Sequence, residues 1–440
     1  MLEHNHHHRY FPRHSRPKSD LHGASVVEAV EMLRDPRPPS SPAQSVLRKS
    51  VRIPASELRL PNKLCYPLDT SGYHNGMHPI SDSTLADLKN NIQLWSRELG
   101  FDAVGISAAE LGDAGPALQR WLGSGWHGEM NFMARHADKR ANPELLVPGV
   151  FRIISVRLGY WSETSGSAEA VLHDSRKAYI ARYALGRDYH RPMRKKLQRL
   201  ADLITEAIGP FAYRAFVDSA PVMEKPLGQH AGLGWIGKNT NLIDPLTGSW
   251  FFLGELYTDL PLPVDSAQVD HCGSCTRCAE ECPTNALDIP YQLDARRCIA
   301  YLTIEHKSSI PEALRALIGN RIFGCDDCQL VCPHNREPGH GDEIFSARHG
   351  LDDVALLELF CWSPSQFTEY SEGSAIRRLG YERWMRNLAV ALGNGPSSEA
   401  TIAALRSRLG AVSEMVDEHI YWALGRLVGE STVTNLEDRS

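Results

Sequence analysis

Eight of the ten cysteines in this 440-residue chain lie in one segment, and their spacing suits metal ligation. The run HCGSCTRCAEECP and the later run CDDCQLVCP carry seven of them, with one more between, so the set is Cys272, Cys275, Cys278, Cys282, Cys298, Cys325, Cys328 and Cys332. The order C-x2-C-x2-C-x3-C-P in the first run is typical of proteins with two 4Fe-4S clusters, in which three thiolates bind one cluster and the fourth binds the other. We therefore predict an iron–sulfur segment.

The number of ligands is complete only if both runs are used together. The second run has the spacing of the last three positions of such a motif, and Cys298 can supply the missing first position. We assign one cluster to Cys272, Cys275, Cys278 and Cys332, and the other to Cys282, Cys298, Cys325 and Cys328. Zinc is the alternative, but a zinc ribbon needs only two separated CxxC pairs. A disulfide framework is disfavoured because the cysteines are concentrated in one part of a long chain without a secretory signal.

Composition sets the broad class. The net charge of -6 excludes a uniformly basic coat but allows a local basic patch. No apolar run reaches the ~18–20 residues of a membrane helix, so we expect a soluble, cytoplasmic protein without a membrane partner.

Residues 1–78 are rich in Pro, Arg, Ser and His and are predicted to be a disordered extension. Its histidines His4, His6, His7 and His8 are read as a solvated tract, and Cys65 and Cys361 as free thiols.

Residues 79–265 are predicted to form an α/β domain. Leu85, Leu88, Ile92, Trp95 and Leu99 follow helical spacing after a Ser83 or Thr84 cap. Strand-like stretches at 101–107, 151–158 and 213–218 alternate with a helix at 191–209.

One loop of this domain carries residues suited to a ligand site. Asp218 ends a predicted strand, and the stretch after it contains Gly228, Gly232, Gly234 and Gly237, which permit close backbone approach to a bulky ligand. The stretch is neither GxGxxG nor a Walker A motif, because Asn239 follows Lys238. A structural turn, and a cap or ion-pair role for Asp218, are the alternatives.

Basic residues precede this loop and recur near the C-terminus. Between 176 and 199 nine Lys and Arg residues face a single acid, Asp188; the group includes Arg191, Arg194, Lys195 and Arg199. Such a run is either a solvated helix face or a phosphate-binding surface.

After a ferredoxin-like segment at 266–341, residues 342–440 are predicted to form a HEAT-like helical domain, with helices near 352–361, 374–393, 397–409 and 414–428.

Several stretches in combination resemble one enzyme family. They are the cysteine runs together with MNFMARHADKRANPELLVPGV, ARYALGRDYH, VDSAPVMEKPLGQHAGLGWIGKNTNLI and YERWMRNLAVALGN. From about residue 80 to 430 this order is similar to that of epoxyqueuosine reductases, cobalamin-dependent iron–sulfur enzymes of tRNA queuosine synthesis. The first 78 residues lie outside the family's usual extent.

The resemblance implies reduction of epoxyqueuosine to queuosine at the tRNA wobble base. It implies base-off cobalamin between the α/β and cluster domains, two 4Fe-4S clusters, an external flavodoxin- or ferredoxin-like one-electron donor, and Asp218 as proton donor. A carboxyl in a mostly apolar pocket has a raised pKa and can act as an acid near neutrality, so we expect such a pocket around Asp218. We expect a monomer.

Contacts to the cofactor and the RNA follow from the same resemblance. Gly237, Lys238, Asn239 and Thr240 are candidate cobalamin contacts, and Tyr189 and His190 are weaker ones. Lys225 is a candidate for tRNA phosphate or substrate hydroxyls, with a solvated lysine as the alternative. Arg191, Arg194, Lys195 and Arg383 are candidate phosphate contacts. The rival functions are a reductive dehalogenase-like reductase and a non-catalytic ferredoxin-type electron carrier.

Overall fold

The computed structural model describes residues 81–429, and every structural statement below concerns that range. The predicted disordered extension, its histidine tract and Cys65 lie outside the described residues. Contacts along the chain group the residues from His78 onward into one compact unit. The boundaries predicted inside that unit stay a prediction.

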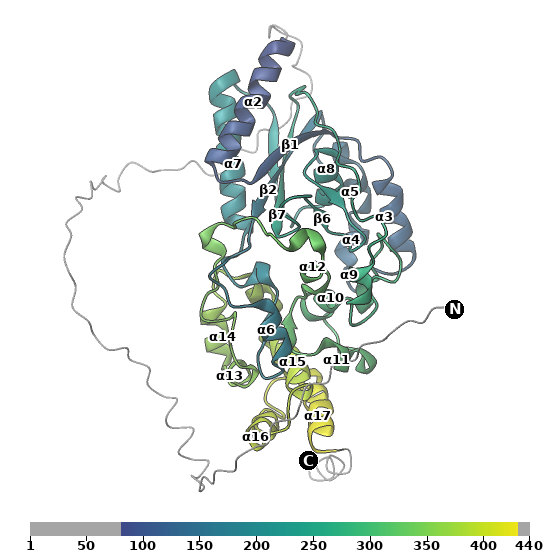
Figure 1. Ribbon diagram of the computed structural model, residues 1–440, viewed down its shortest axis with the longest axis vertical. Coiled ribbons are helices and arrows are strands. Elements are labelled where there is room, and N and C mark those ends of the chain that lie inside the picture. The colour runs from purple at the N-terminus through teal and green to yellow at the C-terminus, as the bar shows by residue number, and fades with distance from the viewer. Residues whose placement is uncertain (1–80, 430–440) are drawn as a thin grey trace, which may run out of the picture. The chain divides into compact units, whose positions relative to one another are not determined.

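A four-stranded sheet forms the centre of the first part (Figure 1). Its strands are β1 (Ala103–Ala108), β2 (Arg152–Gly159), β4 (Tyr213–Phe216) and β7 (Phe251–Thr258), in the order β1-β2-β7-β4. All three pairings are antiparallel, although alternating strands and helices usually indicate a parallel sheet. Two of the three pairings involve β7, which was not predicted and lies between β2 and β4.

Helices cover both faces of the sheet. On one face lie α2 (Asp82–Glu98) and α7 (His190–Ile208), which contact each other and the strands. The other face is covered by α8 (Glu224–His230), which contacts β1, β2 and β7. Because alternate strand residues point to opposite faces, β2 is buried along nearly its whole length.

The local sequence explains the main helices. Ser81 caps α2, its Oγ accepting a hydrogen bond from Thr84 N at 3.2 Å. The predicted apolar stripe of α2 is buried at Leu85, Leu88 and Ile92. In α7 the buried positions follow helical spacing, which leaves the basic positions on the outer side. The buried residues are Met193, Leu197, Leu200, Ala201 and Ile204.

Short elements surround the sheet. They are α3 (Ala114–Gly123), α4 (Asn131–Arg135), α5 (Ala137–Ala141), η1 (Pro143–Leu145), α6 (Ala168–His173), η2 (Arg182–Ala184) and the hairpin of β5 (Trp235–Ile236) with β6 (Leu242–Ile243).

The cysteine segment has little regular structure. Its elements are α9 (Arg277–Glu280), η3 (Ala295–Arg297), α10 (Ile299–Ile304), α11 (Glu312–Ile318), β8 (Arg321–Phe323), α12 (Asp327–Leu330), η4 (Pro333–Asn335) and η5 (Glu343–Phe345). Strand β8 pairs in parallel with β3 (Tyr179–Ile180) and packs on α15 of the C-terminal part. The segment is therefore joined to both of its neighbours.

The C-terminal part is helical, as predicted. Its elements are α13 (Leu356–Phe360), α14 (Pro364–Tyr370), η6 (Ala375–Leu379), α15 (Tyr381–Gly393), α16 (Glu399–Ser407) and α17 (Glu414–Val428). The single helix predicted for 374–393 is two elements, because Gly380 has φ 78° and separates η6 from α15. The HEAT-like assignment stays a prediction.

Candidate functional site

The four thiols assigned to the first cluster line one small cavity. Its volume is about 90 Å³, and its wall includes Cys272, Cys275, Cys278 and Cys332. Burial raises the pKa of Cys278, and the nearby Cys272, Cys332 and Cys275 raise it further. Thiolates crowded in this way repel one another unless a cationic centre compensates them. Trp235 Nε1 lies 3.4 Å from Cys272 Sγ, a hydrogen bond of the kind that tunes a cluster's potential.

The other four cysteines form a second group. Burial raises the pKa of Cys328 well above its usual value, and Cys298 and Cys282 add to the shift. Cys325 is affected in the same way by burial and by Asp327, with a contribution from Cys298. Ala286 N donates a hydrogen bond to Cys282 Sγ at 3.3 Å. Cys278, from the first set, also acts on Cys328, so the division of the eight thiols between two clusters stays a prediction.

A four-iron cluster and a single zinc ion differ in how widely they space their thiolates. Among residues 81–429, no three or more His, Cys, Asp or Glu side chains are placed to hold one metal ion. A single zinc ion draws its four ligands together at ~2.0–2.3 Å, whereas a four-iron cluster spreads its four thiolates around a larger core.

The glycine-rich turn predicted to contact cobalamin packs on the cysteine loops instead of standing free. Lys238 Nζ donates to the carbonyl oxygens of Gly273 and Cys275 at 2.7 and 3.0 Å. Asn239 is buried, and its Nδ2 donates to Cys328 O at 3.3 Å. A Cβ at Gly237 would lie 2.4 Å from Ile243 Cδ1. The side chains of Lys238 and Asn239 therefore support the cysteine loops.

Asp218 lies just beyond β4 in a strained backbone conformation, with φ 38°. Its Oδ2 is 3.2 Å from His190 Nε2, and its own N–H donates to Glu224 Oε1 at 2.6 Å. Tyr189 also hydrogen-bonds Asp218 through its hydroxyl, while its ring stacks on Phe252 at 3.8 Å between centroids. The predicted residues Tyr189, His190 and Asp218 thus share one site.

His190 links Asp218 to a second acid and to a distant arginine. Asp188 Oδ1 is 2.6 Å from His190 Nδ1, and Arg378, from η6, donates to Asp188 Oδ2 at 2.5 Å. Burial opposes the charge on His190, but the hydrogen bonds to Asp188 and Asp218 outweigh it and raise the pKa of the imidazole. With a carboxylate at each ring nitrogen, the imidazolium form is favoured.

The electrostatics of Asp218 differ from the expectation of an apolar pocket. Burial favours the neutral acid, but the hydrogen bond and charge of His190, together with Tyr189 and Arg378, outweigh burial and lower the pKa of Asp218. The carboxyl group with a raised pKa is that of Glu224, which was not predicted as a site residue. Burial and then the charge of Asp218 raise its pKa to about 8.

Asp218 and Lys225 are both exposed residues. Burial lowers the pKa of Lys225, and the nearby Cys328, Glu224 and Cys298 oppose that shift. Lys225 Nζ donates to Thr240 O at 2.8 Å. Lys225 therefore links α8, which follows Asp218, to the glycine-rich turn.

The candidate phosphate contacts fall into two kinds. Arg191, Arg194 and Lys195 are exposed on α7, the helix whose first residue is His190. Arg383 is occupied by its own protein: its guanidinium donates to the carbonyl oxygens of Leu379 and Ile304 at 2.8 and 2.7 Å. This geometry gives Arg383 a structural role and does not favour the predicted phosphate contact.

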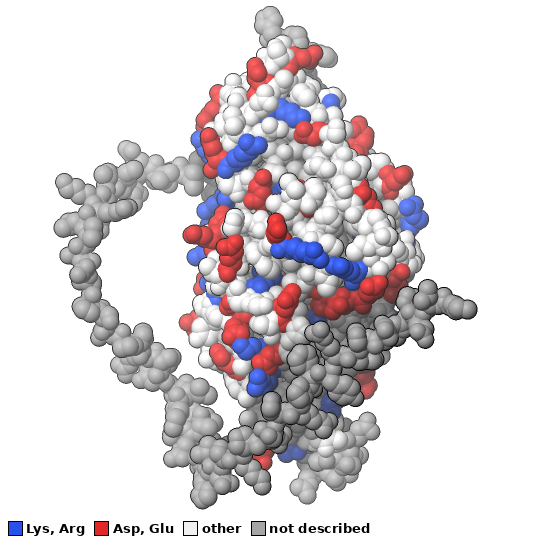
Figure 2. Space-filling model, viewed as in Figure 1, with Lys and Arg blue, Asp and Glu red and all other residues white. Residues whose placement is uncertain are grey.

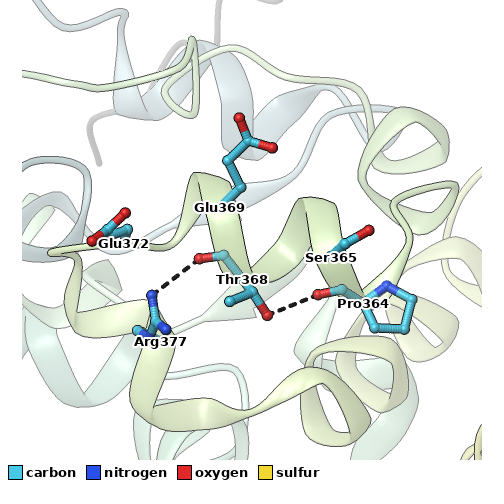
Figure 3. A pocket seen from close by; sticks show the side chains of 6 residues that line it. All are labelled: Pro364, Ser365, Thr368, Glu369, Glu372 and Arg377. Atoms are coloured by element: carbon cyan, nitrogen blue, oxygen red, sulfur yellow. Dashed lines mark hydrogen bonds between the residues drawn. The ribbon is translucent and has the colours of Figure 1, made fainter.

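Figure 2 shows acidic and basic side chains interspersed over the visible face, without a uniform basic coat. An open hollow of about 530 Å³ is lined by residues of α14 together with Glu372 and Arg377. Figure 3 shows these residues, among which Arg377 Nη1 donates to Thr368 O at 3.1 Å. None of the residues predicted for chemistry lines the hollow. No helix among the described residues is long and apolar enough to cross a membrane.

Two family models match the chain. One, described as a 4Fe-4S double cluster binding domain, matches residues 271–335. The other, described as epoxyqueuosine reductase QueG, DUF1730, matches residues 140–219. The first range contains all eight predicted ligands, and the second contains Asp188, Tyr189, His190 and Asp218.

Curated relatives extend the similarity over most of the chain. The epoxyqueuosine reductase of Pseudomonas aeruginosa is 56% identical over 351 residues, which are 79% of this chain and 96% of the relative. The epoxyqueuosine reductase of Escherichia coli is 49% identical over 345 residues, 78% of this chain and 90% of the relative.

Solved structures agree. A crystal structure of epoxyqueuosine reductase with an epoxyqueuosine-modified tRNA-Tyr stem loop has a TM-score of 0.73 and 26% identity, covering 80% of this chain and 94% of that one. The Bacillus subtilis epoxyqueuosine reductase, solved with a catalytic aspartate loop swung out of the active site, has a TM-score of 0.72 and 26% identity over the same shares.

Proposed function

The chain belongs to the epoxyqueuosine reductase family, an oxidoreductase family, and from this premise we propose how its residues reduce epoxyqueuosine to queuosine at the wobble position of tRNA. The observation that carries the proposal is the hydrogen-bonded group of Asp218, His190, Asp188 and Arg378. This group can hold a proton and deliver it, as the reduction of an epoxide requires.

The cofactors are assigned by fit. Cys272, Cys275, Cys278 and Cys332 would hold one 4Fe-4S cluster, and Cys282, Cys298, Cys325 and Cys328 the other. Residues around Lys225 and the Thr240 carbonyl would hold cobalamin. When bound, cobalamin supplies low-valent cobalt chemistry, and the clusters supply single electrons from an external flavodoxin- or ferredoxin-like donor.

The reaction needs protons as well as electrons. Converting an epoxide to an alkene breaks both C–O bonds and consumes two electrons and two protons, with release of water. In our proposal Asp218 delivers a proton to the departing oxygen, and it receives that proton from His190, whose Nε2 is 3.2 Å from its Oδ2. Asp188 holds the imidazole in position through Nδ1. The donor is thus the Asp218–His190 pair, since Asp218 alone is ionised near neutrality.

The tRNA would approach along α7. Arg191, Arg194 and Lys195 are exposed on the helix that begins at His190, so phosphates bound there would bring the modified base towards Asp218. We propose that the protein acts on tRNA as a monomer in the cytoplasm. The tRNA stem-loop complex of a structural relative supports the choice of substrate.

The deciding experiment is conversion of epoxyqueuosine-containing tRNA by anaerobically purified protein. We expect about eight irons and one corrinoid per chain, the loading of two four-iron clusters and one cobalamin. With a strong reductant, the nucleoside digest should contain queuosine. Absence of conversion by fully loaded protein would refute the activity, and full iron without corrinoid would refute the cobalamin assignment.

A further inference from the structure

The loop that carries the first predicted cluster ligands lies at the surface of the protein. Cys272 and Cys275 are half-buried, and the two residues between them are exposed. A Cβ added at Gly273 would meet nothing within 4 Å, so the loop faces open space. Cys325, by contrast, lies between two buried residues. An electron from outside therefore has a shorter path to the first group of thiols than to Cys325.

Three exposed apolar side chains lie beside this loop. They are Val269, Ile289 and Tyr291, with exposed fractions of 70%, 46% and 44%, and we call them the apolar patch. The Tyr291 hydroxyl donates a hydrogen bond to Asp270 Oδ2, and Asp270 Oδ1 accepts one from Cys272 N at 2.7 Å. Asp270 therefore joins the apolar patch to the backbone of a predicted cluster ligand.

Tyr291 is held in a backbone conformation that tyrosine rarely adopts. Its φ is 65°, in the left-handed region that favours glycine. Its N–H donates to Lys238 O at 3.1 Å, and Lys238 Nζ in turn donates to the carbonyl oxygens of Gly273 and Cys275. Such strain persists where the surrounding structure enforces it, often at functional sites. The exposed ring is thus fixed relative to the ligand loop and turned to solvent.

The cavity of the first thiol group has a basic wall. Besides cysteines it includes Lys238, Arg277, His271 and His334, and no acid lines it. Arg277 is exposed and has no ion pair among the described residues. The exposed acids Glu280, Glu281 and Asp288 follow in the chain but are not part of this wall. Because the whole chain has a net charge of -6, local positive charge here would direct an acidic partner to this face.

We propose that the apolar patch and Arg277 form the docking surface for the external electron donor, and that this donor is an acidic carrier of the flavodoxin type. The inference rests on the proposed function, which consumes two electrons per epoxide. A flavodoxin exposes the apolar edge of its flavin on an acidic surface, which suits an apolar patch beside a cation. Each encounter would oxidise the donor by one electron and reduce the protein by one, so two encounters supply one turnover. Transient electron-transfer complexes bury little surface, so a patch of this size suffices.

The first test measures binding without turnover, in the full-length protein with its clusters. Isotope-labelled oxidised flavodoxin is titrated with the protein, and we expect its NMR signals near the flavin to broaden, less so at high salt. Val269→Asp and Tyr291→Gly should each weaken binding about tenfold, because each removes an apolar contact from the centre of the surface. Glycine suits the left-handed φ at position 291, so that loop should still fold. Leu317→Asp, 41% exposed on α11, is the matched control.

The second test follows cluster absorbance after rapid mixing with reduced flavodoxin. Val269→Asp, Tyr291→Gly and Arg277→Gln should be reduced about tenfold more slowly than wild type, and Arg277→Gln should depend less on salt. Dithionite is a small reductant that needs no docking surface, so its rate of cluster reduction should be the same in all variants. Arg406→Gln, exposed on α16, is the control for loss of a charge.

The outcomes are separable. Absence of flavodoxin binding by wild type, or wild-type binding and reduction rates in the variants, would overturn the docking surface. Equal slowing with dithionite would also overturn it, because the clusters themselves would then be altered. Reduction by a ferredoxin but not by flavodoxin would overturn the type of donor, and self-association that Val269→Asp abolishes would assign the apolar patch to a second copy of the chain. If Tyr291→Gly does not fold, Val269→Asp decides.

Neither measurement uses tRNA. A fully loaded wild type that makes no queuosine would therefore overturn the proposed function, whatever the flavodoxin measurements show.

Discussion

Asp218 has a strained backbone conformation, and three side chains distant in the sequence lower the pKa of its carboxyl group. A φ of 38° is unusual for a residue other than glycine, and such strain is often found where a side chain is held for chemistry. Its sequence context suggested an acid in an apolar pocket. The structure instead surrounds it with His190, Tyr189 and Arg378, which lower its pKa. Those partners are up to 160 positions away in the chain, so no local pattern could reveal them.

Replacing the carboxyl group of Asp218 should reduce turnover without changing cofactor loading. We expect Asp218→Asn to keep iron and corrinoid loading but to lose about 10²-fold or more of its turnover, because the amide cannot pass a proton to the epoxide oxygen. Ser219→Ala, at the next position, should remain active. Turnover of Asp218→Asn at the wild-type rate would remove Asp218 from the donor pair.

The imidazole can be tested by its titration. His190 has a raised pKa, so it is protonated below that pKa and loses its charge as pH rises through it. In Asp188→Asn one carboxylate is gone, and we expect the pKa of His190 to fall by on the order of one unit. NMR of protein labelled at histidine nitrogen would follow this signal, identified by its absence in His190→Gln. An unchanged midpoint would contradict the role of Asp188.

At the scale of elements, η6 of the C-terminal part reaches back to the first residue of α7. Arg378 donates to Asp188 at 2.5 Å, and its Nη2 lies 3.0 Å from His190 Nδ1. The helical part therefore completes the site as well as packing beside it. From the sequence, Arg383 of this part was predicted to contact phosphate and Arg378 was given no role, because charge alone cannot distinguish an inward from an outward side chain.

Loss of this contact should disturb the site without unfolding it. Arg378 is half-exposed, so we expect Arg378→Gln to fold and bind both clusters, while turnover falls about tenfold because Asp188 and His190 are less well held. Arg377→Gln, at the adjacent position in the open hollow of Figure 3, is the control and should behave as wild type. Equal losses in the two variants would argue against a specific role for Arg378.

The exposed face of α7 should dominate the salt dependence of tRNA binding. Replacing Arg191, Arg194 and Lys195 together by Ala should weaken binding and reduce the slope of log K against log salt by about two to three. Arg199→Ala should have a smaller effect than Arg194→Ala, since Arg199 is already paired with Glu206 at 2.8 Å. A triple variant with the wild-type salt slope would exclude this face.

At the scale of the whole described unit, one buried arginine joins the cysteine segment to the C-terminal helices. Arg386, in α15, is 0% exposed and donates to the carbonyl oxygens of Leu302, His306 and Ser308 at 2.8, 2.9 and 2.7 Å. These carbonyls lie at and beyond the end of α10, which follows the ligand Cys298. Burial lowers the pKa of Arg386 to about 10, so it remains charged at neutral pH.

Breaking this junction should destabilise the protein. Arg386→Met leaves three carbonyl groups without donors, and we expect a loss of ~3–5 kcal/mol, seen as a lower midpoint in anaerobic denaturant unfolding of the holoprotein. Cluster absorbance should disappear in the same transition. Arg406→Met, on the exposed side of α16, is the control. An unchanged midpoint for Arg386→Met would show that the junction contributes little.

The sequence by itself determined the elements whose signals are local. Cysteine spacing predicted the segment that the double-cluster model matches, and Cys272, Cys275 and Cys278 line one cavity because short loops bring CxxC ligands together. Helical and strand periodicities located α2, α7, β1, β2 and β4 to within a few residues.

Only the tertiary structure decided how these parts meet. Strand β7 was missed because it is buried on both faces and its sequence lacks a clear alternation of polar and apolar residues. The sequence therefore did not predict the strand order β1-β2-β7-β4 or the position of Glu255 in the sheet. The charge of Asp218, the inward role of Arg378 and the packing of the glycine-rich turn on the cysteine loops all depend on contacts between residues far apart in sequence. Burial and electrostatics act through space, so a pKa becomes defined only when the chain has folded.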